Sequence, residues 1–230
     1  MARKNDLDEF YEILKALDHT YGERCLTDCD GHMGWPKQGV YFFFEAGEIR
    51  ESTGTPRVVR VGTHVITEHS QTTLRDRLRA HKGPTRGEYA PGGNHRGSVF
   101  RLHIGTALIM RDRMACSTWG KQSSADRQTR IAEKPLEISV SEVIRTMPFL
   151  WIRAEDTPST DSVRSVIERN SIALLSNYRK TAIDPSSQRW LGRYCSNEKV
   201  QLSGLWNDRH VEEQYDPTFL RLFARLAAGT

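Results

Sequence analysis

An aromatic stretch at residues 39–45, GVYFFFE, constrains the fold more than any other segment of the chain. If it is a β-strand, its side chains alternate between two faces. One face then carries Val40, Phe42 and Phe44, and the other carries Tyr41, Phe43 and Glu45. A core strand has no obvious need for a phenol, because phenylalanine would pack as well. Packing alone therefore does not explain the hydroxyl of Tyr41.

The rest of the pattern predicts an α+β fold with one small, mostly antiparallel sheet flanked by helices. A polar loop at residues 45–56, with Gly and Pro, joins the first strand to a second at residues 57–64, so the two form a hairpin with a long connection. Further strands are predicted at residues 98–109 and 148–155. Helices are predicted at residues 6–18, 69–83, 138–147, 160–178 and 217–228.

Turn-rich and polar segments suggest how the chain is divided. We expect an N-terminal helical extension at residues 1–35, a core at residues 36–182, and a C-terminal extension at residues 183–230 that packs on the core. Two polar stretches inside the core, at about residues 82–97 and 111–137, are expected to be loops or insertions.

Composition narrows the functional class. The chain has 230 residues, 37% of them hydrophobic, and no apolar run long enough for a membrane span, so we expect a cytoplasmic protein without a membrane partner. Residues 50–134 contain 16 Lys and Arg against 7 Asp and Glu, although the net charge of the whole chain is only +4. This concentration of positive charge favours an anionic partner such as a nucleic-acid backbone. A merely solvated basic face remains the alternative.

Four cysteines allow two interpretations. Cys25 and Cys29, with His32 and Cys195, have the residue types of a zinc site, but no second closely spaced ligand pair exists. We favour reduced, separate thiols.

Four features occur in a fixed order along the chain: Gly39-Val40-Tyr41, Arg60-Val61-Gly62, Arg77 followed four residues later by His81, and Glu168 within a helix. This order resembles the GIY-YIG nuclease superfamily over roughly residues 39–180. It is most similar to the restriction-endonuclease-like branch, in which a histidine follows the arginine by one helical turn. The resemblance implies a small sheet whose first hairpin carries both name-giving motifs. It also implies an essential arginine on the next helix and a metal-binding glutamate on a later one.

The chemistry of phosphodiester hydrolysis gives these residue types roles. A base must activate water, and cations must stabilise the charge that develops on the phosphate. Tyr41 would be the base; a phenol is mostly protonated at neutral pH, so it needs cationic neighbours or a metal to act in this way. Arg77 would clamp the phosphate, and Arg60 and His81 would assist. The ordinary alternatives are a surface strand tyrosine and a polar histidine at a helix end.

Glu168 would be the ligand of Mg²⁺ or Mn²⁺, because Mg²⁺ often binds through one or two carboxylates together with substrate oxygens and water. A solvated helix glutamate is the alternative. Compared with the family pattern, Arg60 replaces the second motif's tyrosine and the loop between the motifs is long. Many members carry an asparagine after the glutamate helix; Asn177 is the nearest candidate and lies closer to the glutamate than expected. His64 follows the second motif and is an accessory candidate.

The sequence thus predicts a metal-dependent DNA endonuclease of restriction or defence type, and a homodimer is a candidate assembly. A non-catalytic nucleic-acid-binding module, or a repair or recombination nuclease, remains an alternative. Basic residues near the arginine helix are expected to contact DNA: Arg75, Arg79, Lys82, Arg86 and Arg96.

Overall fold

The computed structural model describes residues 2–64, 72–157, 159 and 161–229. The strands are β1 (Arg24–Cys25), β2 (Gly39–Ile49), β3 (Pro56–Thr63) and β4 (Pro148–Arg153). The α-helices are α1 (Ala2–Tyr21), α2 (Leu74–Lys82), α3 (Val99–Asp112), α4 (Arg127–Arg145), α5 (Val163–Leu175), α6 (Glu198–Ser203) and α7 (Phe219–Ala227). Short 3₁₀ helices are η1 (Leu26–Asp28), η2 (His95–Gly97) and η3 (Leu191–Tyr194).

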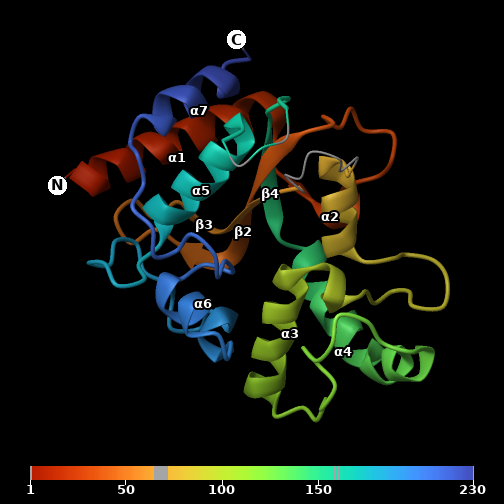
Figure 1. The fold of residues 1–230 in the computed structure, drawn as a ribbon. Helices are drawn as coiled ribbons and strands as arrows, with labels where there is room; N and C mark the ends of the chain where they lie inside the picture. The colour runs from red at the N-terminus through yellow and green to blue at the C-terminus, as the bar shows by residue number, and fades with distance from the viewer. Residues whose placement is uncertain (1, 65–71, 158, 160, 230) are drawn as a thin grey trace.

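The described strands form one sheet in the order β1-β4-β2-β3, and each neighbouring pair is antiparallel. In the β2–β3 hairpin Tyr41 lies opposite Gly62, and Phe43 lies opposite Arg60. β3 is therefore the edge strand next to the aromatic strand (Figure 1). The α+β fold class with a small, mostly antiparallel sheet flanked by helices is confirmed.

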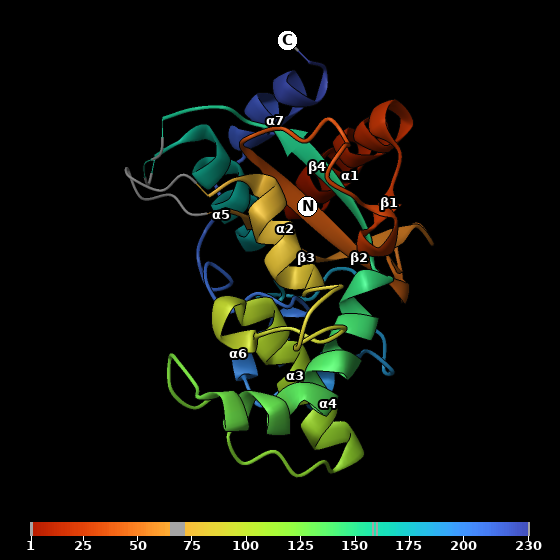
Figure 2. The same ribbon diagram turned by 90° about the vertical axis from the view of Figure 1, so that its right-hand side faces the viewer.

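Helices cover both faces of this sheet. Val40, Phe42 and Phe44 pack in one hydrophobic cluster with apolar residues of α1, α5 and α7. Tyr41 and Phe43 pack in a second cluster with residues of α2, α3 and α4. Figures 1 and 2 show these two helical layers on opposite sides of the strands. The predicted alternation of side chains along residues 39–45 is confirmed, and the phenol of Tyr41 faces the layer of α2, α3 and α4.

The hairpin is more regular than the sequence predicted, since β2 continues to Ile49 through the expected loop. Two acidic side chains in this part are buried against partners. Glu48 forms an ion pair with Arg57 at 2.6 Å, and Glu45 accepts hydrogen bonds from the indole N–H groups of Trp190 and Trp206. A polar sequence thus became a strand because Arg57 on the partner strand pairs with Glu48, and two tryptophans far along the chain donate hydrogen bonds to Glu45.

The register of the hairpin shifts at two places, between Phe43 and Phe44 and between Phe44 and Ile49. Phe43 pairs with Arg60 and Phe44 pairs with Val58, so Val59 is an extra residue, as in a β-bulge. Two consecutive residues of β3 therefore lie opposite Phe43. Arg60 lies before the first shift, directly opposite Phe43 in the regular register, so its side chain is on the same sheet face as Phe43 and Tyr41.

The strand predicted at residues 98–109 is wrong, because this segment forms α3. The Ser98 hydroxyl accepts a hydrogen bond from the Arg101 N–H and caps the helix. Phe100, Ile104 and Leu108 are buried at a spacing of four residues. This spacing is typical of one helix face, and the run of apolar residues concealed it.

The expectation of loop structure at residues 111–137 is wrong for its second half, because α4 begins at Arg127 with Asp126 as its N-cap. Glu133 and Glu137 are buried on this helix, each paired with an arginine. A helix whose buried face carries carboxylates has no apolar period, so its pattern was not recognised.

The other predicted helices are confirmed with shifted ends, as is the strand at residues 148–155. The helix predicted at residues 69–83 is α2, which Thr73 caps together with Asp76 in a capping box; residues 69–71 lie outside the described part of the chain. Trp190 and Trp206 of the C-terminal segment are buried in the core. Within the described ranges, no helix is both long and apolar enough to cross a membrane.

Candidate active site

The Tyr41 hydroxyl lies in a closed polar pocket between β2, β3 and α2. Its oxygen is 2.8 Å from His81 Nε2. Gly62, directly opposite on β3, has no side chain to obstruct the ring; a Cβ there would lie 2.2 Å from the phenol oxygen. The close approach of the ring to β3 therefore requires glycine at this position. Tyr41 itself is 0% exposed, which excludes the expected alternative of a surface tyrosine.

His81 links Tyr41 to the start of α3. Its second ring nitrogen, Nδ1, is 2.7 Å from the Ser98 hydroxyl, and the ring is fully buried. In the tautomer protonated at Nδ1, His81 donates to Ser98 and accepts the hydrogen bond of the Tyr41 hydroxyl at Nε2. A continuous hydrogen-bond chain thus runs from the phenol to Ser98. Because the ring is buried, the alternative of a polar histidine at a solvated helix end is excluded for His81.

The charge state of His81 follows from its surroundings. Burial is the main reason that the pKa of His81 lies well below its usual range. The guanidinium groups of Arg77, Arg60 and Arg101 lower it further, in that order. The imidazole is therefore neutral at neutral pH and has a nitrogen available to accept a proton.

The two predicted arginines approach the pocket from different elements. Arg60 is only 6% exposed; its Nη1 donates to the Trp206 carbonyl at 2.6 Å, and its guanidinium lies over the Phe100 ring. Arg77, on α2, is half-buried and donates to the Gly97 carbonyl at 3.2 Å. Both cations act electrostatically on His81 and on Glu168. The pocket therefore has positive charge on two sides.

Glu168 reaches this region from the opposite helical layer. It is half-buried on α5, and its Oε1 accepts a hydrogen bond from the backbone N–H of Thr63 at 3.2 Å. Thr63 follows Gly62 at the end of the edge strand. Burial raises the pKa of Glu168 above its usual range, and the charge of Arg60 is the largest of the effects that oppose this rise. The carboxylate is thus placed at the sheet edge, next to the residue that faces Tyr41.

Glu168 has the donor type that a divalent metal requires. One of its oxygens is used by Thr63, and the other accepts no hydrogen bond from the described residues. Among the described residues there is no group of three or more His, Cys, Asp or Glu side chains that could hold an ion. Mg²⁺ commonly uses one or two carboxylates and takes its remaining ligands from water and substrate phosphates. A single carboxylate with one oxygen that accepts no hydrogen bond from the described residues fits that mode.

His64, the accessory candidate, is buried beside Arg164, and its Nε2 is 2.5 Å from the guanidinium Nη1. Burial, and then the Arg164 charge, lower the pKa of His64 to about 4. Asn177, the other accessory candidate, joins the N-terminal helix to the turn after α5: its amide bonds to Arg3 and to the backbone of Ile183. These contacts give Asn177 a structural role.

The basic residues expected to contact DNA fall into two groups. Arg75 and Arg79 are exposed on α2 and donate no hydrogen bond to the described residues, and Arg86 is exposed in the following loop. Lys82, half-buried at the end of α2, donates to the Cys29 carbonyl. Arg96 differs from these, because both of its terminal nitrogens bond to Glu133 in a buried ion pair. Arg96 is therefore not available to bind a phosphate in this arrangement.

The cysteines lie in two places. Cys25 and Cys29 adjoin η1, and the thiol of each donates to a backbone carbonyl. Cys195 is buried beside His103 on α3, with 3.9 Å between its sulfur and Nδ1. All four thiols are free.

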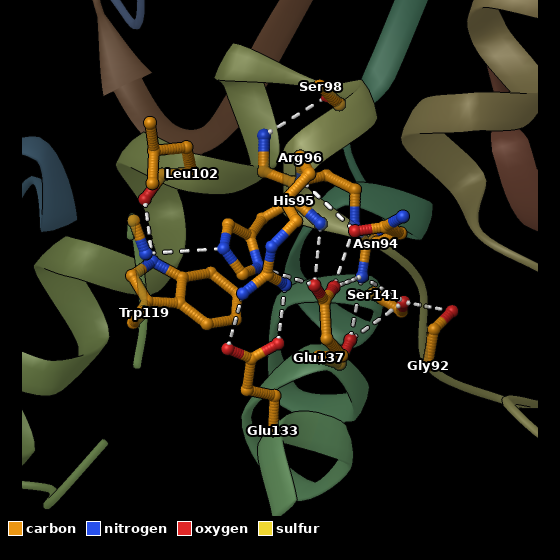
Figure 3. Close-up of polar contacts among 12 residues, drawn as sticks. Gly92, Asn94, His95, Arg96, Ser98, Leu102, Trp119, Glu133, Glu137 and Ser141 are labelled. Atoms are coloured by element: carbon orange, nitrogen blue, oxygen red, sulfur yellow. Dashed lines mark hydrogen bonds and ion pairs between the residues drawn. The ribbon is translucent and has the colours of Figure 1, made fainter. Parts of the chain in front are cut away.

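A buried polar network behind the pocket was not predicted. Arg101 donates from Nη1 to the His81 carbonyl at 2.7 Å and pairs with Glu137 at 2.5 Å. Glu137 also accepts from the N–H and the Nδ1 of His95, whose ring stacks on Trp119 (Figure 3). This network fixes the end of α2, where His81 lies, against α3 and α4. The only sequence signal was an excess of charged residues in segments that proved to be buried.

A second unpredicted pair lies on the Arg60 side. His103 Nε2 is 3.3 Å from an Asp208 carboxylate oxygen. This contact, assisted by the charge of Arg60, lowers the pKa of Asp208 to about 2. Asp208 therefore balances part of the positive charge around the pocket.

No curated protein and no solved structure matches this chain. A family model described as GIY-YIG domain matches residues 1–230, the whole length of the sequence. The match agrees with the antiparallel hairpin in which Tyr41 faces Gly62. The chain therefore belongs to the GIY-YIG domain family, a family of nucleases.

Proposed function

We propose that this protein is a metal-dependent endonuclease that hydrolyses phosphodiester bonds of DNA. One observation carries the proposal: the Tyr41 hydroxyl bonds to a neutral, buried His81, with Arg60, Arg77 and Glu168 around the same strand ends. A phenol with a proton acceptor behind it and cations beside it suits the activation of water next to a phosphate.

Proton transfer in this arrangement follows from the hydrogen-bond chain. As Tyr41 accepts a proton from the attacking water, its own proton passes to His81 Nε2. The water oxygen forms a bond to phosphorus, the bond from phosphorus to the sugar oxygen breaks, and the sugar oxygen takes a proton from solvent. Burial first, and then the nearby guanidinium groups, lower the pKa of His81 and make it a weak base in the free protein. A bound phosphate offsets these charges, so substrate binding itself increases the basicity of His81.

The other residues stabilise charge. Arg77 is the phosphate clamp, since a guanidinium can donate to two phosphate oxygens at once. Arg60, fixed by the Trp206 carbonyl, contributes positive charge from the opposite side. Mg²⁺ or Mn²⁺, held through Glu168, supplies further positive charge for the phosphate and the leaving oxygen.

The spacing of Arg77 and His81 supports a restriction or defence role, because it is similar to that of the restriction-endonuclease-like branch. Cutting both strands would then favour a homodimer, each copy cleaving one strand.

A second candidate function, nucleic-acid binding without catalysis, is favoured by one feature of the pocket. Tyr41 and Arg60 are both buried, and Arg60 is occupied by a backbone carbonyl. Catalysis therefore requires the pocket above the Tyr41 hydroxyl to open when substrate binds, whereas a binding module has no such requirement.

Digestion of plasmid and phage DNA with the purified protein in Mg²⁺, Mn²⁺ or EDTA tests the proposal. Tyr41→Phe and Glu168→Gln are compared with Tyr194→Phe and Glu155→Gln, which make the same changes at exposed positions. We expect metal-dependent cleavage that falls by about 10²–10⁴-fold in Tyr41→Phe, the usual contribution of general acid–base catalysis, and is lost in Glu168→Gln.

The products distinguish the roles. Discrete fragments support restriction, whereas a smear lost in the same two variants supports a repair or recombination nuclease. DNA that is bound and left intact by every preparation contradicts catalysis and supports the binding module.

A further inference from the structure

A groove of about 620 Å³ lies along α2, between that helix and the segment after β1. It extends across the exposed ridge of α2, at Asp76 and Ala80, to Gly97. The Gly97 carbonyl accepts the hydrogen bond of Arg77, so the groove ends beside the proposed phosphate clamp. In Figure 2, α2 lies in front of the sheet with this side of the molecule toward the viewer.

The groove has a positive lining. Arg75, Arg79, Lys82 and Arg130 line it together with two acids, Asp30 and Asp76, an excess of two positive charges. The acids are already engaged: Asp76 accepts hydrogen bonds in the Thr73 capping box, and Asp30 accepts the N–H of His32. The guanidinium groups of Arg75 and Arg79 have no hydrogen-bond or ion-pair partner among the described residues and are exposed. The groove thus offers two exposed guanidinium groups that have no partner among the described residues.

Part of the lining is fixed in position. The Arg75 guanidinium lies so close to Gly31 that an added Cβ would be 2.5 Å from its Nη2. Lys82 bridges from α2 to the Cys29 carbonyl on the facing segment. Trp35, which also lines the groove, packs on Trp151 and donates from its indole N–H to the Asp30 carbonyl. A preformed wall with cations and an aromatic ring resembles the platforms that bind single strands of nucleic acid.

The volume of the groove indicates whether it binds a single nucleic-acid strand or a duplex. A cavity of this size belongs to the class that encloses a single small molecule, which corresponds to about one or two nucleotides. A duplex is much wider than such a groove and would contact only its rim. An unpaired strand can place its phosphates against the guanidinium groups and a base against the indole.

We propose that this groove binds an unpaired segment of the DNA strand adjoining the cleaved bond, so that the preferred substrate is a duplex with a single-stranded tail. This inference rests on the proposed nuclease function and names the substrate class of the same site.

Fluorescence anisotropy in EDTA tests the proposal with labelled blunt duplex, the same duplex with an unpaired tail, and the tail alone. The double variant R75A/R79A is compared with K15A/R221A, which removes the same charge from exposed positions on α1 and α7, in the opposite layer. R79A alone is the second test variant, because Arg75 packs against Gly31. Thermal unfolding verifies that each variant is folded.

We expect the full-length protein to bind tailed duplex about tenfold more tightly than blunt duplex, corresponding to about 1.4 kcal/mol. R75A/R79A should remove this difference and reduce the salt slope for the tailed duplex by about 1.4, since each phosphate contact to a single strand contributes about 0.7. R79A should reduce the difference in affinity between the two duplexes in part, and K15A/R221A should retain this difference. Equal binding of both duplexes by the wild-type protein, or a preference that survives in R75A/R79A, overturns the inference.

Cleavage of the same oligonucleotides in Mg²⁺ separates this inference from the proposed function. Cleavage without any preference for the tail leaves the nuclease function standing and overturns the groove. A tail preference in binding that R75A/R79A removes, without cleavage of any substrate, supports the groove and overturns the nuclease.

Discussion

The buried ion pair between Arg101 and Glu137 provides a quantitative test of how the candidate site is supported. The Arg101 side chain is 0% exposed and that of Glu137 is 4% exposed. Glu137 accepts from Nε and Nη2 of Arg101 and from two nitrogens of His95, at distances between 2.5 and 2.9 Å. Burial alone would raise the pKa of Glu137, but the His95 and Arg101 contacts outweigh it and lower that pKa. The carboxylate is therefore charged in the folded protein at neutral pH.

Glu137→Gln removes the negative charge while preserving the shape of the side chain. Arg101 then stays buried without a counter-charge, and the new amide N–H group faces donors. Breaking one side of a buried ion pair costs about 3–5 kcal/mol. For a chain of this length each kcal/mol lowers Tm by about 2–4 °C, so we expect a decrease of about 6–20 °C.

Thermal unfolding followed by circular dichroism measures this decrease, with Glu88→Gln as the matched control. Glu88 pairs with Arg127 in an equally direct contact, but the two side chains are 41% and 73% exposed. Solvent screens an exposed pair, so the control should leave Tm nearly unchanged. In the double variant R101Q/E137Q no charge remains buried, and part of the lost stability should return. Equal Tm values for Glu137→Gln and Glu88→Gln would refute the argument that burial sets the magnitude.

Three further predictions concern the pocket. Ser98→Ala should slow cleavage by removing the Nδ1 partner of His81, at a cost of about 1 kcal/mol in unfolding free energy from the lost N-cap. Gly62→Ala should abolish cleavage, because its Cβ would displace the Tyr41 ring, whereas Gly34→Ala, which meets no atom within 4 Å, should not. Burial, and then the charge of Arg164, lower the pKa of His64 to about 4, so the unfolded chain binds a proton that the folded protein does not, and stability should fall as pH decreases from 6.5 to 4. In urea titrations His64→Asn should reduce that pH dependence.

The local sequence pattern was sufficient to predict the hairpin and most of the helices. The alternation along residues 39–45 placed Tyr41 on the face opposite Val40 because strand geometry allows only two directions for a side chain. The spacing of apolar residues predicted the first and last helices equally well, since each helix buries one apolar stripe against the sheet. These features depend only on neighbours within a few residues.

Features that depend on distant partners could not be predicted. Glu133 and Glu137 look like surface residues until Arg96 and Arg101 are known to pair with them. For the same reason Arg96 looked like a DNA contact. No spacing in the sequence relates these four positions, because the pairing exists only when α4 packs beside η2 and α3. The structure brings two of the candidate site residues, Tyr41 and His81, into a contact that the sequence did not predict, and the network behind His81 was missed.

The position of the site at the edge of the sheet follows from strand geometry. Tyr41 must lie on the face of α2, and Glu168 comes from α5 on the other face, so a continuous sheet would separate the two groups. They approach each other only at the last residues of the edge strand. Gly62 lets the phenol lie against the backbone there, and the next residue, Thr63, directs its N–H outward to Glu168. Because an interior strand has its backbone groups paired on both sides, only an edge strand can offer such an N–H to a side chain. The pairing of Tyr41 with Gly62 on an edge strand therefore explains how the proposed base and the proposed metal ligand, which come from opposite layers, could serve one site.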